Sequence, residues 1–143
     1  MSDTLGTIWP CLPHTQAKHR ILERYLKAWM PIVASFVKKP QRVLFVDGFA
    51  GPGQYERGEP GSPVVALRAA AQHSRTFPVP IDFLFIEKDP ERLAHLIRVL
   101  DGMKAELAWI QPAFLYKVGI IKKHCSSICC NEQVTISQNK III

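Results

Sequence analysis

The chain has 143 residues, 48% of them hydrophobic, so it is long enough for one modest domain around a single core. Its formal charge is +6, but no dense basic run occurs, so charge alone is weak support for nucleic-acid binding. No apolar run approaches the roughly 20 residues of a membrane span, and the start lacks the pattern of a secretory signal. We therefore expect a cytoplasmic protein without a membrane segment.

The first predicted element is an amphipathic helix within a segment of residues 1–38. Thr15 is its candidate cap, and Pro31 predicts a kink or a break near Met30. Apolar residues recur at the spacing of a buried helix face, at Ile21, Leu22, Tyr25, Leu26, Trp29, Ile32, Val33 and Phe36. We expect Tyr25 and Trp29 in the core and the helix packed on a sheet. The alternative is that its basic face contacts a substrate or a partner.

Two apolar runs predict the strands of a parallel sheet. The continuous apolar runs are residues 43–46 and 83–86, which suits strands covered on both faces with bounds of about 42–46 and 81–86. Residues 107–110 could add a third strand. Because strands alternate with helices, residues 39–116 are predicted to form part of an α/β, Rossmann-like domain with right-handed crossovers.

Two further helices are predicted from their starts. Ser62 can cap the first, and Pro63 suits its first helical position. Asp89 can cap the second, which Asp101 and Gly102 are expected to end. The buried face of the second helix is predicted to hold Leu93, Leu96, Ile97 and Leu100.

A glycine-rich loop after the first strand is the candidate binding site. Asp47 ends that strand, Gly48, Gly51 and Gly53 follow, and Glu87 ends the second strand. Open α/β sheets bind ligands at the carboxyl ends of their strands, and glycines let the backbone approach a ligand closely. The glycine order matches neither the dinucleotide fingerprint nor the phosphate loop.

These features favour a cofactor without phosphate, such as S-adenosyl-L-methionine. Asp47 could bind its amino group, directly or through water, and Glu87 its ribose hydroxyls. Phe49 and Tyr55 flank the loop, and either could pack on the adenine ring. The alternative is a tight turn with two solvated acids.

Three segments together resemble one known family. They read Lys18-His19-x-Ile-Leu-x-x-Tyr25-Leu-x-Ala-Trp29, then Val46-Asp-Gly-Phe-Ala-Gly-Pro-Gly-x-Tyr55, then Gly58-x-x-Gly61-Ser62-Pro63. Over about residues 9–100 the chain resembles the three-Cys-motif partner proteins (TcmP) of bacteria and archaea. The resemblance implies a class I methyltransferase-like fold, S-adenosyl-L-methionine as cofactor, and a three-Cys-motif protein from a neighbouring gene as partner. It implies no methyl acceptor.

The chain also departs from that family, whose members are longer and carry a further strand ending in an Asp-Pro type motif. We therefore expect an incomplete class I methyltransferase fold, with the first two or three parallel strands and their flanking helices. Such a domain is expected to be inactive as it stands, and no catalytic residue is assigned. One alternative is a non-enzymatic module that binds the three-Cys-motif protein; another is a fragment of a methyltransferase that modifies nucleic acid.

Residues 117–143 have a different composition, with seven isoleucines, three cysteines and one glycine. We expect an atypical tail, foreign or read out of frame. The cysteines at 125, 129 and 130, with His124, lack the paired spacing of a structural zinc site, so no metal is expected. The histidines at 14, 19, 73 and 95 are expected to have surface or packing roles.

Overall fold

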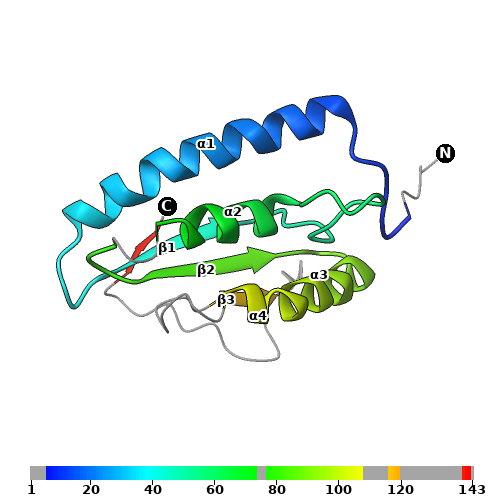
Figure 1. Ribbon diagram of the computed structural model, residues 1–143. Coiled ribbons are helices and arrows are strands. Elements are labelled where there is room, and N and C mark those ends of the chain that lie inside the picture. Colours follow the sequence, from blue (N-terminus) through cyan, green and yellow to red (C-terminus); the bar gives the residue numbers. More distant parts are fainter. Residues whose placement is uncertain (1–5, 74–76, 108–115, 120–139, 143) are drawn as a thin grey trace.

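The computed structural model describes residues 6–73, 77–107, 116–119 and 140–142 of the chain (Figure 1). This part is an α/β structure with four helices and one four-stranded sheet. The elements in chain order are α1 (Pro13–Phe36), β1 (Arg42–Asp47), α2 (Ser62–Ala71), β2 (Ile81–Ile86), α3 (Pro90–Gly102), α4 (Lys104–Leu107), β3 (Tyr116–Gly119) and β4 (Lys140–Ile142).

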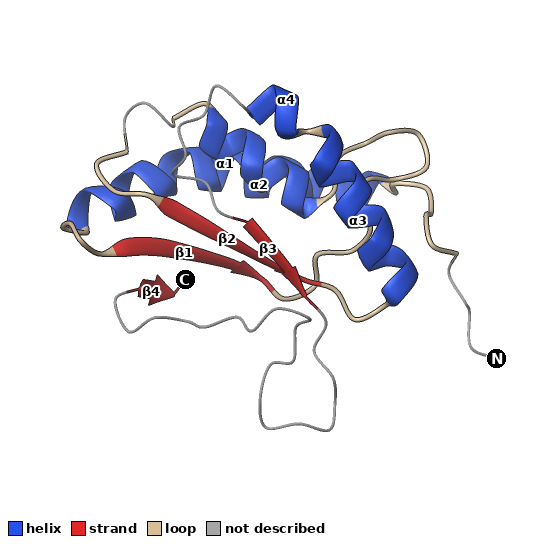
Figure 2. Cartoon of the chain, turned by 90° about the horizontal axis from the view of Figure 1, so that it is seen from below, coloured by secondary structure: helices blue, strands red, loops and turns tan. Residues whose placement is uncertain are grey.

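The strands are parallel and lie in the order β3-β2-β1-β4 (Figure 2). The bounds of β1 and β2 confirm the two strands predicted from the apolar runs. The register sets Val43 opposite Ile81 and Asp47 opposite Phe85, so the acidic ends of both strands reach the same edge. The direction of strand addition reverses at β1, and sheets of this kind bind ligands beside such a reversal.

One face of the sheet carries the main core. Phe83 and Phe85 of β2 point into it and are 1% and 0% exposed, together with Leu96 of α3. Leu84 points to the opposite face, where it packs with Leu44 of β1. Figure 1 shows α1 lying along α2 on one side of the sheet. Right-handed crossovers that advance in one direction across a sheet place successive helices on the same face, which accounts for α2 and α3; α1 precedes β1 and reaches the same side by packing on α2.

Helix α1 differs in two respects from its prediction. It begins at Pro13 after Leu12, and Thr15 lies within the helix instead of capping it. It also continues through Pro31 to its end, so the expected break does not occur. Met30 and Ala34, on either side of the proline, are buried in the core. Their packing holds the helix together where the proline removes one backbone hydrogen bond.

The outer side of α1 is more apolar than the prediction assumed. Tyr25 is 55% exposed, so its predicted place in the core is wrong, while Trp29 is half-buried and stacks on it with ring centroids 5.7 Å apart. Ile21, Ile32 and Phe36 are also exposed. The apolar positions cover too wide an arc of the helix for all of them to meet one sheet face.

The starts of α2 and α3 illustrate two kinds of cap. Asp89 caps α3 as predicted, because its Oδ1 accepts hydrogen bonds from the amides of Glu91 and Arg92 at 2.9 and 3.0 Å. Gly61 occupies the cap position of α2, and Ser62 makes no capping bond. On α3 the predicted buried face is only partly correct, since Leu96 and Leu100 are buried but Ile97 is 43% exposed.

The C-terminal part of the chain contributes two short strands. Strand β3 pairs with β2, and β4 pairs with β1, although no strand pattern was expected to join residues 117–143 to the core. The third strand expected at residues 107–110 is not supported at Leu107, which ends α4. Residues 108–110 and the cysteines at 125, 129 and 130 lie outside the described residues. The division of the chain into the segments 1–38, 39–116 and 117–143 stays a prediction.

Candidate functional site

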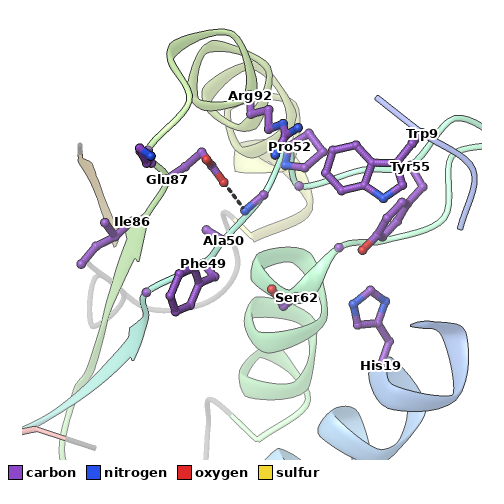
Figure 3. Close-up of a pocket in the computed structure, with 15 residues that line it drawn as sticks. Trp9, His19, Phe49, Ala50, Pro52, Tyr55, Ser62, Ile86, Glu87 and Arg92 are labelled. Carbon is purple, nitrogen blue, oxygen red and sulfur yellow. Dashed lines mark hydrogen bonds between the residues drawn. The ribbon is translucent and has the colours of Figure 1, made fainter. Parts of the chain in front are cut away.

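A pocket of about 640 Å³ opens at the carboxyl ends of β1 and β2 (Figure 3). Its volume falls within the range of roughly 300–1,000 Å³ typical of small-molecule sites. Six of the seven residues predicted for the cofactor site line it: Gly48, Phe49, Gly51, Gly53, Tyr55 and Glu87. Asp47 does not line the pocket. The sheet therefore brings the glycine loop and one of the two acids to a common cavity.

Glu87 is the buried carboxylate of the pocket, at 8% exposure. Its Oε2 accepts a hydrogen bond from the Gly51 amide at 2.8 Å, and its Oε1 accepts one from the Asp89 amide at 2.8 Å. A carboxylate offers about four lone-pair sites, so further acceptor capacity remains beside the cavity. Glu87 thus fixes the glycine loop and can still accept hydrogen bonds from a ligand.

Asp47 is joined to the pocket through Ser62. Its Oδ2 accepts a hydrogen bond from the Ser62 hydroxyl at 2.6 Å, and its Oδ1 accepts one from the Phe49 amide at 3.1 Å. Ser62 itself lines the pocket. Because its hydrogen is directed to Asp47, the Ser62 oxygen presents lone pairs that suit a cationic group. The predicted capping role of Ser62 is wrong because the hydroxyl serves the strand-end acid instead.

The glycines of the loop serve different physical needs. Gly51 has φ 66° and Gly53 has φ 80°, both in the region that favours glycine. A Cβ at Gly51 would project into open space, as would one at Gly48. A Cβ at Gly53 would lie 2.7 Å from Cδ1 of Leu96. Gly48 and Gly51 therefore leave room over the loop, while Gly53 permits close packing on α3.

The loop is braced from three directions. The Ala50 amide donates to the Ile86 carbonyl at 3.0 Å, which ties the loop to β2. Nδ1 of His95 lies 2.7 Å from the Pro52 carbonyl oxygen, which ties it to α3. The Gly61 amide donates to the Gly53 carbonyl at 2.8 Å, immediately before α2. Such bracing holds a binding loop in one arrangement before a ligand arrives.

An aromatic wall, which we define as Trp9, His19 and Tyr55, borders the pocket away from Glu87 (Figure 3). The Tyr55 ring centroid lies 5.8 Å from that of Trp9 in an edge-to-face arrangement and 5.6 Å from that of His19. The Arg92 guanidinium carbon lies 4.7 Å from the Trp9 ring centroid, a cation–π contact. The N-terminal segment, α1, the loop and α3 thus meet at this wall.

The electrostatics of the wall favour neutral rings. Burial lowers the pKa of His19 from its ordinary value of 6.5, and the Asp47 charge opposes that change in part. Burial also raises the pKa of Tyr55, and Cys11 adds to the effect. At neutral pH the wall therefore presents an uncharged imidazole and a phenol. Both groups can exchange hydrogen bonds with a polar ligand.

Phe49 stands at the pocket mouth and is 95% exposed. A ligand in the pocket could cover this ring, because Phe49 is one of the lining residues. Its position is compatible with the predicted stacking on an adenine ring.

Nine of the pocket residues were not among the predicted site residues, and four of the nine lie outside the glycine loop and carry aromatic or basic side chains: Trp9, His19, Lys88 and Arg92. His19 was expected to have a surface or packing role. The segment Lys18-His19 within the family resemblance was the one signal that could have singled it out. Trp9 lies before the first periodic element, so no helix or strand pattern marks it.

The described part of the chain contains neither a cluster of metal-binding side chains nor a membrane-spanning helix. Among those residues, no group of three or more His, Cys, Asp or Glu side chains is arranged to hold a metal ion. None of the described helices is long and apolar enough to cross a membrane. Comparison with protein-family models, curated proteins and solved structures found no match.

Proposed function

We propose that this chain is an S-adenosyl-L-methionine-binding domain of the class I methyltransferase type, as its resemblance to the TcmP family implies. The observation that carries the proposal is the glycine loop after β1, whose Gly51 amide is held by the buried Glu87. Loop and acid lie at adjacent ends of parallel strands, beside the reversal of strand order.

The residues present suit this cofactor. The open space over Gly48 and Gly51 admits a ligand close to the backbone. Glu87 has acceptor capacity for ribose hydroxyls, and the Ser62–Asp47 pair offers an acceptor for an ammonium group. The bound cofactor would supply an activated methyl group for transfer to a nucleophile. What the chain itself provides is positioning, which can contribute a large share of such catalysis.

Isothermal titration with S-adenosyl-L-methionine and with S-adenosylhomocysteine tests the proposal. We expect saturable binding that Glu87→Gln weakens by roughly tenfold or more, because charge-assisted hydrogen bonds contribute about 1.5–3 kcal/mol. The matched control is Glu56→Gln, an exposed acid outside the pocket, which should bind as the parent does. Failure of both ligands to bind would reject the proposal. The experiment measures binding, because the proposal does not require the chain to turn over a substrate.

A second candidate function is favoured by the outer side of α1. Ile21, Ile32 and Phe36 are 69%, 55% and 81% exposed, and their spacing puts them on one side of the helix, where grouped apolar side chains can bind a partner. Through these residues the chain would then bind a three-Cys-motif protein, the partner that the resemblance implies. Co-purification of the two gene products should be abolished by Ile32→Glu and unaffected by Glu87→Gln. The reverse pattern would exclude this surface.

A further inference from the structure

Basic residues of α1 are the sequence neighbours of His19, the member of the aromatic wall that this helix contributes. Lys18 and Arg20 immediately precede and follow His19, and both side chains are exposed. Arg24 is exposed one turn further along the same helix. The whole chain carries a formal charge of +6. Exposed lysine and arginine side chains of this kind bind the phosphates of nucleic acids with little dependence on the base sequence.

The wall itself has the chemistry of a base-binding surface. Trp9 and Tyr55 provide ring surfaces, and the guanidinium of Arg92 lies against Trp9. The uncharged imidazole of His19 makes no hydrogen bond within the described residues, so its nitrogens can meet the polar edge of a ring. Aromatic residues interleaved with basic ones are typical of proteins that stack bases of a single strand and track its phosphates.

We propose that the aromatic wall binds one nucleobase of a single-stranded nucleic acid, while Lys18 and Arg20 contact the neighbouring phosphates. The base would lie in the same pocket as Glu87 and the glycine loop. A base paired within a duplex cannot enter such a pocket, so an unpaired strand or an extruded base is required. In naming nucleic acid as the substrate class of this pocket, the inference rests on the proposed function. Binding of the single strand does not require the cofactor.

The first test uses the unmodified protein and three fluorescein-labelled 12-nucleotide strands: RNA, DNA of the same sequence, and DNA whose central positions are abasic. Fluorescence anisotropy should show binding to RNA, DNA or both, and the preferred polymer identifies the source of the base. The abasic strand retains the phosphates, so it should bind about 5- to 150-fold more weakly than the matched DNA; if RNA alone binds, an abasic RNA strand of the same sequence is compared with the intact RNA instead. Equal binding of abasic and intact strands, or binding of none, would overturn the proposal.

The second test separates phosphate contacts from general charge. The variant Lys18→Ala/Arg20→Ala removes two charges beside the wall. Its matched control, Lys38→Ala/Lys39→Ala, removes two exposed charges just beyond the C-terminal end of α1, which runs about 27 Å from Lys18 to Phe36. Plots of log affinity against log salt concentration should lose about 1.4 units of slope in the first variant and none in the control, since each phosphate contributes roughly 0.7. Equal slopes in both variants would contradict the predicted contacts.

A third measurement addresses the wall residues. Tyr55→Leu should weaken binding of the intact strand and leave binding of the abasic strand unchanged; Trp9→Leu repeats the comparison should the first variant fail to fold. Loss of both strands in equal proportion would reject stacking. Titration with S-adenosylhomocysteine distinguishes the two proposals: cofactor binding without strand binding refutes this inference alone, whereas strand binding without cofactor binding refutes the proposed function alone.

Discussion

Substitution of the loop glycines by alanine separates the effect of backbone conformation from that of packing. Gly53→Ala would suffer both, because φ is 80° and the new Cβ would lie 2.7 Å from the buried Leu96 side chain. A left-handed conformation costs a non-glycine residue roughly 1–2 kcal/mol, and overpacking typically costs about 1–3 kcal/mol. The free energy of unfolding should therefore fall by about 2–5 kcal/mol.

Two other glycines provide the matched controls. Gly51→Ala has the unfavourable φ of 66° but open space around its Cβ, so we expect a loss of about 1–2 kcal/mol. Gly48→Ala meets neither obstacle and should change stability by no more than about 0.5 kcal/mol. Under the proposed function its added methyl group enters the space that the ligand would occupy, so its effect should appear in cofactor affinity instead.

Urea denaturation followed by circular dichroism measures all three variants on one scale. From most to least stable, the expected order is Gly48→Ala, Gly51→Ala and Gly53→Ala. The slope of the free energy of unfolding against urea concentration should be the same in all three. If Gly53→Ala were as stable as Gly48→Ala, the close approach of the loop to α3 would be wrong. A stable Gly51→Ala variant would likewise contradict its positive φ.

Three further predictions concern charged and titratable groups. Glu87→Gln should lower the free energy of unfolding by about 1.5–3 kcal/mol in urea denaturation, since the Gly51 amide loses a charged acceptor. An unchanged urea midpoint would show that this hydrogen bond does not stabilise the fold. Arg42→Met should cost about 3 kcal/mol in the same assay, because the 3%-exposed Asp82 loses a two-point ion pair, and Asp82→Asn/Arg42→Met should recover part of it. Burial lowers the pKa of His19, so below about pH 6.5 the unfolded chain binds more protons than the folded chain, and the free energy of unfolding should fall there. His19→Gln should flatten this dependence of stability on pH. An unaltered dependence would refute the lowered pKa of His19.

Local patterns predicted the elements well where one physical requirement dominated. The apolar runs predicted β1 and β2 within one residue, and Asp89 with Pro90 marked the start of α3. In these cases the residues have a single favourable environment, a covered strand or a helix cap. Parallel pairing of the two strands correctly predicted that Asp47 and Glu87 lie at the same edge of the sheet.

Predictions failed where two environments compete for the same residue. Ser62 suits a helix cap, but its hydroxyl is directed to Asp47, a residue 15 positions earlier that only the folded loop brings near. Tyr25 suits a core position by spacing, yet the arc of α1 that meets the sheet excludes it. Trp9 joins the pocket through contacts with Tyr55 and Arg92, which no local pattern contains. Long-range contacts of this kind depend on tertiary structure.

The two hydrogen bonds of Glu87 have a consequence for the dynamics of the chain. One carboxylate holds the amide of Gly51 and the amide of Asp89, and thereby joins two connecting segments that are separated by a helix and a strand. Neither segment can open without breaking a bond to the same group. Their amide hydrogens should therefore exchange with deuterium at correlated rates, and a ligand that engages Glu87 should slow both together.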